Sequence, residues 1–364
     1  FRIWEEMRGF KTIKKQPTQP QSQPQYEVAD VLNKLGSKLE DLGLNSWQLR
    51  TLFALKKCRT SALGGHIDAC DECGNISISY NSCRNRHCPK CQGRNREDWI
   101  QTRETELLPV PYFHVVFTLP EVLNKTALHE PKMLYDILFE SAWETLQTFG
   151  KNKNLQMGMI AVLHTWGQNL SLHPHLHCIV PGGGVDENGA WKNIKNDGKF
   201  LFPVKALSKV FRAKFCEKLK ANLKDKFNEN QENEYEKIRQ SLWEKPWVVY
   251  AKKPFGSPKS VVEYLGRYTH KIAISNGRIR GIDDKTVTFD YKDYRQKGIK
   301  KQMVLSHEEF IRRFAMHILP KRFVKIRHYG FLSSTWKRIK LKNLQQKLGI
   351  QTKEKPLSKV FQPK

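Results

Sequence analysis

Two histidines one residue apart form the first group of side chains that could do chemistry. His175 and His177 lie within the segment 171–180, which reads Ser-Leu-His-Pro-His-Leu-His-Cys-Ile-Val. Alternate side chains of a β-strand point to the same face, so a strand here would place both imidazoles side by side. Such a pair can hold one metal ion. Taken alone, packing or surface histidines are the simpler interpretation.

Two tyrosines form the second group. Tyr264 and Tyr268 stand at the ends of Tyr-Leu-Gly-Arg-Tyr, and a helix beginning near residue 257 would present both phenols on one face. That spacing alone is also typical of core aromatics. Beside a metal ion that polarises a phosphate, however, a tyrosine oxygen could attack phosphorus. Arg267 or Lys271 would then help the cation to stabilise charge on the reacting phosphate.

Two histidines do not complete a metal site, so we expect a third ligand on the same face. Gln168 is the first choice, ahead of His173, Asn169 and Glu263. His173 shares the alternation, but Pro174 would disturb the strand at that point. A site that mixes imidazole with oxygen ligands and keeps open positions for phosphate favours Mg²⁺ or Mn²⁺ over structural zinc.

The cysteines predict a separate, structural metal site. Six of the eight cysteines lie between Cys58 and Cys91. The pairs Cys70-x2-Cys73 and Cys88-x2-Cys91 have the spacing of a closed four-cysteine zinc site. A disulfide framework is disfavoured, because the cysteines are confined to one segment and no secretory signal is visible. A second zinc ion stays open, with the candidate ligands Cys58, His66, Cys83 and His87.

The charge of the chain indicates a polyanionic partner. There are 63 Lys and Arg residues against 36 Asp and Glu residues, a net charge of +27, which favours nucleic acid. A membrane is disfavoured, since no apolar run approaches the ~20 residues that span a bilayer and no lipidation motif is visible. Residues 321–364 hold thirteen basic residues and one acid. The candidate phosphate contacts are Arg84, Arg86, Arg94, Arg267, Lys271 and Arg327.

Hydrophobic periodicity predicts the elements that must position these groups. Apolar residues at helical spacing predict helices within 28–55, 135–149 and 207–223, and apolar runs predict strands at 113–119, 158–163 and 175–180. The Asn276-Gly277 pair predicts a hairpin turn between 272–274 and 286–291. We expect five consecutive segments: a linker or disordered segment at 1–25, N-terminal helices at 26–57, a zinc-binding module at 58–104, a core at 105–300 with a helical insertion near 203–244, and a basic C-terminal helical region and tail at 301–364.

In combination, these motifs resemble the two-tyrosine rolling-circle transposases of bacterial insertion sequences, the insertion sequence 91 family of the HUH endonuclease group. The resemblance spans about Tyr26 to Leu332. Its order of motifs is specific, although each motif alone is weak. They are Cys70-x2-Cys73, the run from Asn81 to Cys91, Phe113 to Pro120, His173 to His177, Pro181 to Gly184, Tyr264 to His270, and Arg327 to Gly330.

The resemblance implies an α+β fold, in which an HUH endonuclease core with a central antiparallel sheet flanked by helices follows a small helical and zinc-binding module. It implies a metal-dependent enzyme that nicks and rejoins single-stranded DNA at the ends of an insertion sequence. His175 and His177 would hold Mg²⁺ or Mn²⁺, and Tyr264 and Tyr268 would form 5′-phosphotyrosine links. Single-stranded or hairpin element ends and target DNA would be the partners, in the cytoplasm at the bacterial nucleoid. The oligomeric state stays open.

Three other functions are compatible with parts of the pattern. A replication initiator or relaxase would use the same nicking chemistry at one origin. A zinc-ribbon nucleic-acid-binding protein would use the cysteines and the basic charge without catalysis. A metallohydrolase with a His-x-His site would cut without forming a covalent adduct with DNA.

Overall fold

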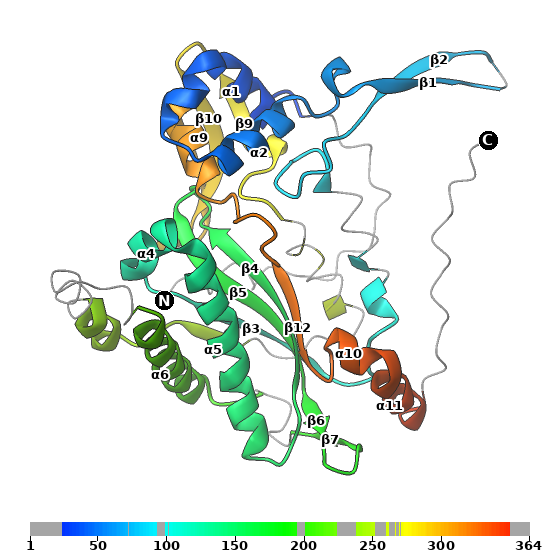
Figure 1. The fold of residues 1–364 in the computed structure, drawn as a ribbon, viewed down its shortest axis with the longest axis vertical. Helices are drawn as coiled ribbons and strands as arrows, with labels where there is room; N and C mark the ends of the chain where they lie inside the picture. The colour runs from blue at the N-terminus through cyan, green and yellow to red at the C-terminus, as the bar shows by residue number, and fades with distance from the viewer. Residues whose placement is uncertain are drawn as a thin grey trace. The chain divides into compact units, whose positions relative to one another are not determined.

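The computed structural model describes residues 24–71, 73–92, 99–100, 102–194, 201–223, 238–251, 260–261, 266, 269 and 271–349. The chain forms two compact units, each built from segments distant in sequence (Figure 1). The first unit combines the N-terminal part, up to residue 94, with residues 165–172 and 271–321, and the second takes the remainder. The five consecutive segments expected from the sequence stay a prediction, because compact units need not coincide with domains.

The first unit begins with two helices in the region 28–55, where the sequence predicts one or two. They are α1 (Val28–Leu35) and α2 (Ser46–Lys56), joined by the 3₁₀ segment η1 (Gly36–Leu42). The side chain of Asn45 accepts the backbone N–H of Gln48 at 2.9 Å and so caps α2. Apolar residues of both helices join α9 (His307–Ala315) in one buried core that includes Leu32, Leu52 and Phe310.

A three-stranded antiparallel sheet in the order β11-β10-β9 completes that core. Its strands are β9 (Ile279–Ile282), β10 (Thr286–Asp293) and β11 (Ile299–Ser306). The hairpin turn predicted at Asn276-Gly277 is wrong, because residues 276–278 form the 3₁₀ turn η5 and Asn276 Oδ1 accepts the backbone N–H of Val28. The tight turn lies at 283–285, where the Asp283 carboxylate accepts the N–H groups of Lys285 and Thr286.

The second unit contains a five-stranded antiparallel sheet in the order β12-β4-β5-β3-β8. The three predicted strands are confirmed as β3 (Tyr112–Thr118), β4 (Gly158–Trp166) and β5 (Leu172–Pro181). The edge strands are β8 (Val249–Ala251) and β12 (Ile326–Gly330). The last strand lies inside the region expected to be helical, so that region also completes the sheet.

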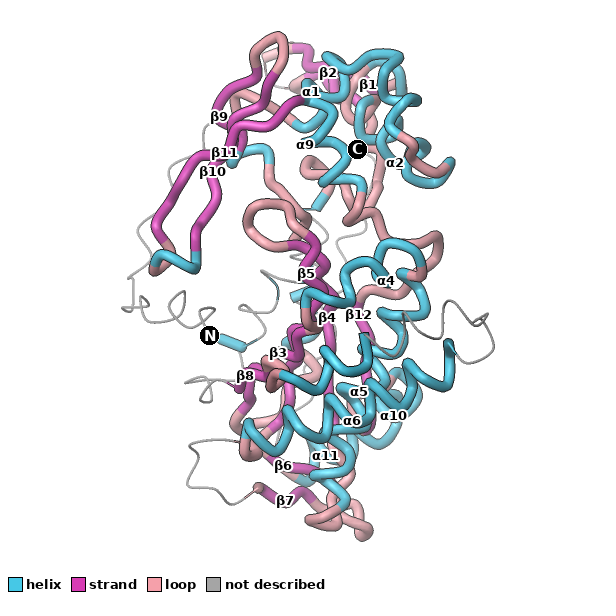
Figure 2. The backbone as a smooth tube through the Cα atoms, turned by 90° about the vertical axis from the view of Figure 1, so that its left-hand side faces the viewer, coloured by secondary structure: helices cyan, strands magenta, loops and turns pink. Residues whose placement is uncertain are grey.

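Apolar periodicity predicted the helices α5 (Pro131–Lys151) and α6 (Val204–Leu223), and the structure confirms both. They pack together (Figures 1 and 2). The ring of Phe211 on α6 lies 4.9 Å from that of Phe117 on β3, which places α6 over the Phe117 face of the sheet. The opposite face, with Tyr112, Ile160 and Ile179, packs against the C-terminal helices. These are α10 (Ser334–Trp336), the π-helical turn η7 (Lys337–Leu341) and α11 (Lys342–Lys347).

The remaining described elements are short. In the first unit they are η2 (Ser61–Leu63), the hairpin of β1 (Gly65–Ala69) and β2 (Ile76–Tyr80), and η6 (Tyr294–Gln296). In the second unit they are η3 (Glu121–Leu123), α4 (Asn124–His129) and the hairpin of β6 (Gly183–Val185) and β7 (Trp191–Asn193). In the part of the chain that the structure describes, no helix is both long and apolar enough to cross a bilayer.

Candidate active site and zinc centre

Three histidines from adjacent strands gather on one face of the five-stranded sheet. His175 and His177 lie on β5, and His164 lies on the neighbouring strand β4. One ring nitrogen of each lies within 4.8 Å of the others. The Nε2 atoms of His175 and His177 are 3.2 Å apart, as strand alternation predicts. This His cluster is a candidate metal site. It lies on the sheet face opposite α6, because His177 shares the parity of Ile179 on β5.

Hydrogen bonds orient two of the three rings. The Nδ1 of His175 donates to the carbonyl oxygen of His173 at 2.7 Å, which leaves Nε2 with its lone pair. The Nδ1 of His177 lies 2.9 Å from Nε2 of His114 on β3, and these two rings stack at 10°. Both Nδ1 atoms are engaged, and the two Nε2 atoms lie at hydrogen-bonding distance from each other. A divalent cation fits this donor set, because it would accept a lone pair from each Nε2 atom in place of the hydrogen bond between them.

His164 is the member of the cluster that sequence reasoning missed. Its ring centroid lies 4.6 Å from that of His177, and its side chain is buried. It sits near the end of an apolar strand with no neighbouring metal-ligand spacing. Only the pairing of β4 beside β5 reveals it, so no local motif could have found it.

The expected third ligands have other contacts in the structure. The carbonyl of Gln168, in the first unit, accepts a hydrogen bond from Arg278, while Asn169 Oδ1 accepts from the Ser171 hydroxyl. β5 runs through Pro174, and burial lowers the pKa of the neighbouring His173. Glu263 lies outside the described residues. A ligand role for the Gln168 side chain stays a prediction.

Both expected nucleophiles, Tyr264 and Tyr268, lie outside the described residues. Arg267, and Arg94 of the zinc-binding module, lie outside them as well. Their roles stay predictions from the sequence.

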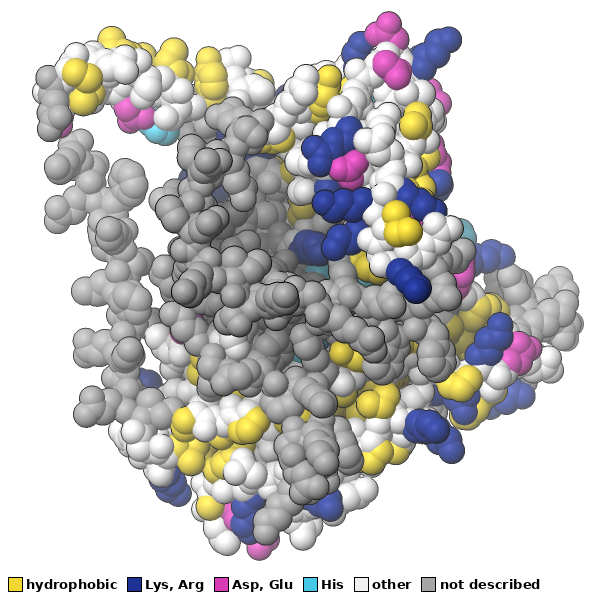
Figure 3. Space-filling model, turned by 180° about the vertical axis from the view of Figure 1, so that it is seen from behind, with side chains coloured by type: hydrophobic (Ala, Val, Ile, Leu, Met, Phe, Trp, Pro, Cys, Tyr) yellow, Lys and Arg dark blue, Asp and Glu magenta, His cyan; other side chains and the backbone are white. Residues whose placement is uncertain are grey.

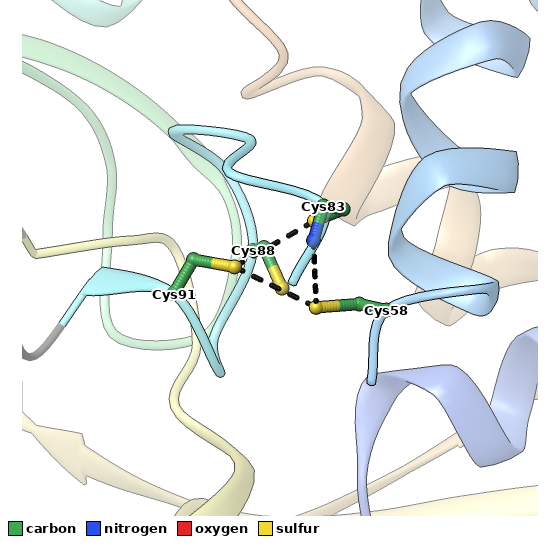
Figure 4. Close-up of side chains that lie close together, drawn as sticks. All are labelled: Cys58, Cys83, Cys88 and Cys91. Carbon is green, nitrogen blue, oxygen red and sulfur yellow. Dashed lines mark hydrogen bonds between the residues drawn. The ribbon is translucent and has the colours of Figure 1, made fainter. Parts of the chain in front are cut away.

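Four cysteines of the first unit form a second cluster (Figure 4). Cys58 follows α2, Cys83 follows β2, and Cys88 and Cys91 belong to the next loop. The sulfur of Cys91 lies 3.5 Å from that of Cys58 and 3.7 Å from that of Cys83. A tetrahedral zinc ion with Zn–S bonds of about 2.3 Å requires sulfurs about 3.8 Å apart. The cluster therefore fits zinc closely.

The pKa values of the cluster's thiols also favour a bound cation. Hydrogen bonding to Cys83, burial and repulsion from neighbouring thiolates raise the pKa of Cys88 far above its ordinary value. The hydrogen bond from Cys88 lowers the pKa of Cys83 to about 5. Burial raises the pKa of Cys58 to about 11. Four thiolates at this spacing need a cation to neutralise them, and zinc supplies that charge.

The predicted pairing of the two Cys-x2-Cys motifs is therefore wrong. Cys88 and Cys91 join Cys58 and Cys83, whereas Cys70 and Cys73 lie exposed at the tip of the β1–β2 hairpin. The hairpin explains the difference. Its two antiparallel strands bring the chain back on itself, and at its base the backbone N–H of Arg59 donates to the carbonyl oxygen of Asn81 at 3.0 Å. The cysteines on either side of the hairpin therefore meet at this base. Cys70 and Cys73 lie in the turn at the opposite end of the hairpin.

The two histidines considered for a second zinc ion also have other contacts. The Nδ1 of His87 lies 3.1 Å from Asn85 Oδ1, and its Nε2 accepts the backbone N–H of Leu319 at 3.1 Å. His66 lies exposed on β1, with Nε2 3.6 Å from a carboxylate oxygen of Asp68. Both contacts are typical of structural or surface histidines.

The expected phosphate contacts divide into two groups. Arg84 and Lys271 are exposed. Arg86 donates to the Pro320 carbonyl at 3.0 Å, and burial lowers its pKa. Arg327 pairs with Asp136 and lies over the Phe139 ring at 4.2 Å. Figure 3 shows basic side chains on the described part of the face it presents, in keeping with the net charge of +27.

The regions of this chain that match known protein families include both the His cluster and the four-cysteine cluster. Residues 158–339 match a family model described as "Putative transposase", and residues 30–119 match one described as "Transposase zinc-binding domain". The chain is 44% identical over 337 residues to "Putative transposase y4qJ" of Sinorhizobium fredii (strain NBRC 101917 / NGR234), a match covering 89% of this chain and 84% of that relative.

A second relative is the "Transposase for insertion sequence element IS801" of Pseudomonas savastanoi pv. phaseolicola. It is 29% identical over 306 residues, which cover 81% of this chain and 73% of the relative. No solved structure matches the chain significantly.

Proposed function

This chain belongs to the IS91 family of transposases, and on that premise we propose that it nicks and rejoins single-stranded DNA at insertion-sequence ends through 5′-phosphotyrosine intermediates. The observation that supports this most is the His cluster, in which two Nε2 atoms converge beside His164. It offers a cation site on a sheet, which holds ligands more rigidly than a loop does.

The covalent step forms one phosphorus–oxygen bond and breaks another. The Tyr264 or Tyr268 oxygen attacks the phosphorus of a phosphodiester while the bond from phosphorus to the 3′ oxygen breaks. The phenol loses its proton, and the departing 3′ oxygen gains one. The new phosphotyrosine diester keeps the energy of the broken linkage, so a 3′-hydroxyl can later attack it and release the tyrosine without a nucleotide cofactor. Two tyrosines would allow one strand end to be held while another is cut.

The residues of the His cluster fit a divalent cation. We assign His164 as the third ligand beside His175 and His177, with Gln168 as the alternative. When bound, the cation supplies Lewis-acid polarisation of the phosphate and offsets its negative charge. Three imidazoles favour Mn²⁺ over Mg²⁺, because Mg²⁺ prefers oxygen ligands.

DNA binding itself follows from the family, and the single-stranded form of the substrate belongs to the proposal. The exposed Arg84 and Lys271 are the described candidates for phosphate contacts. Arg86 and Arg327 instead serve packing first, since their guanidinium groups bond Pro320 and Asp136. Binding should weaken with salt through counterion release.

The test uses the full chain, Mn²⁺ and single-stranded DNA from the flanks of its own gene, labelled at the 3′ end. A 5′-phosphotyrosine link would carry the label onto protein in a denaturing gel and leave an upstream fragment with an extendable 3′-hydroxyl. The Tyr264→Phe/Tyr268→Phe double variant should form no adduct, while Tyr291→Phe on β10 serves as the matched control. Adduct formation by the double variant, or cleavage without any adduct, would refute the mechanism.

A further inference from the structure

The β1–β2 hairpin ends in a turn whose two cysteines, Cys70 and Cys73, do not belong to the four-cysteine cluster. Cys70 N–H donates to Asn75 O, and Gly74 N–H donates to Cys70 O, both at 2.9 Å. Gly74 has a φ of +68°, a conformation that glycine adopts readily. This closed turn holds Cys70 and Cys73 at the spacing that lets two thiolates bind one ion.

The cysteines of one chain cannot complete this tip site. Of the eight cysteines, four form the cluster at the hairpin base, and Cys178 and Cys216 are buried in the second unit. Five residues of strand separate base from tip, about 16 Å at the usual rise per residue. The tip pair therefore supplies two of the four ligands that structural zinc requires.

The hairpin also carries an apolar face that its own unit leaves uncovered. The strand register places Ile67, Ile76, Ile78 and Tyr80 on one side, with exposed fractions of 70%, 66%, 60% and 45%. A two-stranded ribbon is marginally stable by itself in water. An exposed apolar patch of this kind is typical of a protein interface.

The charge of the hairpin argues against DNA as its partner. Residues 60–82 contain the acids Asp68, Asp71 and Glu72 and no Lys or Arg, in a chain with a net charge of +27. Figure 3 shows hydrophobic, acidic and histidine side chains along the described part of this hairpin. A phosphate backbone would be repelled by it.

We propose that the hairpins of two copies of this chain join, with Cys70 and Cys73 of each copy holding one tetrahedral Zn²⁺ between the tips. A second copy supplies the two missing thiolates in the same turn geometry, and its apolar face covers the first. Each thiol loses a proton on binding the ion. The proposal goes beyond the nicking chemistry, and neither depends on the other.

The test measures zinc by mass spectrometry and molecular mass by light scattering, with the full chain in a non-thiol reductant that prevents disulfides. Every protein in the test carries His164→Ala/His175→Ala, which removes zinc from the His cluster. With a wild-type hairpin, this protein should bind one and a half zinc ions per chain and have twice the 42.6 kDa mass of the chain. Cys70→Ser/Cys73→Ser should bind one zinc ion per chain and be monomeric. Asp71→Asn, in the same turn, should behave as the protein with the wild-type hairpin.

A second variant keeps the thiols and changes the apolar face. Ile67→Thr/Ile78→Thr should raise the dissociation constant of the dimer at least tenfold. Two zinc ions per monomeric chain, or a dimer of equal affinity in the Cys70→Ser/Cys73→Ser variant, would overturn the proposal. One zinc ion per chain with the wild-type hairpin would do so as well.

Discussion

His177 on β5 is held by a histidine of the adjacent strand: its Nδ1 lies 2.9 Å from Nε2 of His114, with the rings stacked at 10°. His114 is buried, with 2% of its surface exposed. It belongs to the apolar strand β3, where it pairs in register with Ile179. Through this contact His114 orients the imidazole of His177 so that Nε2 faces the other two histidines.

His114→Phe should therefore weaken metal binding without removing a ligand. Phenylalanine keeps the stacked ring but cannot form the hydrogen bond to Nδ1 of His177. Loss of such a supporting contact typically lowers metal affinity about 10–100-fold, which calorimetry with Mn²⁺ would measure. His129→Phe, at an exposed position of α4, is the control. Wild-type affinity in His114→Phe would show that the contact does not orient the ligand.

His164→Ala should abolish Mn²⁺ binding and adduct formation while leaving affinity for single-stranded DNA within about twofold, since three ligands hold a catalytic ion far better than two. Gln168→Ala is the matched comparison and should retain most metal affinity. Isothermal titration and the labelled-adduct assay give the two measurements. The opposite order of effects would restore Gln168 as the third ligand and assign His164 to packing.

Cys58→Ser should remove the zinc ion at the hairpin base and lower the melting temperature of the protein by on the order of 10 °C, because structural zinc contributes several kcal/mol of folding free energy. Cys70→Ser, at the exposed tip, should lower it far less. Calorimetry together with zinc analysis checks both variants. Equal destabilisation by the two variants would instead support the zinc site predicted from the sequence, in which Cys70 and Cys73 join Cys88 and Cys91.

Acid should destabilise the protein through two buried histidines. Burial, with the charges of Lys337 and Arg103, lowers the pKa of His328 to about 3, and burial lowers that of His317 to about 4, from ordinary values near 6.5. Between pH 6.5 and those values the unfolded chain binds more protons, so stability falls as pH falls. Each histidine contributes at most about 1.4 kcal/mol per pH unit.

Urea unfolding at several pH values between 4.5 and 6.5 measures this slope. In His328→Gln the slope should be shallower, because glutamine can still accept a hydrogen bond from Lys337 but does not titrate. Comparison of the two proteins at each pH cancels any contribution from zinc release. An unchanged slope would show that His328 is not the titrating group.

Local patterns in the sequence were sufficient for much of the fold. The apolar runs that became β3, β4 and β5, and the periodic segments that became α5 and α6, depend on interactions over a few residues. The convergence of His175 and His177 has the same local origin, since strand alternation places them together. One local signal was misleading. Asn276-Gly277 has the composition of a hairpin turn, but the Asn276 side chain accepts the backbone N–H of Val28 at the start of α1 instead.

The membership of both metal sites was decided only by the tertiary structure. His164 reaches the His cluster because β4 lies beside β5, and no motif around it records that pairing. Cys58 and Cys83 join Cys88 and Cys91 because the strands of the β1–β2 hairpin bring its flanks together and carry Cys70 and Cys73 to the far end. Sequence spacing determines which residues can share an ion, whereas strand pairing across long stretches of chain decides which ones meet.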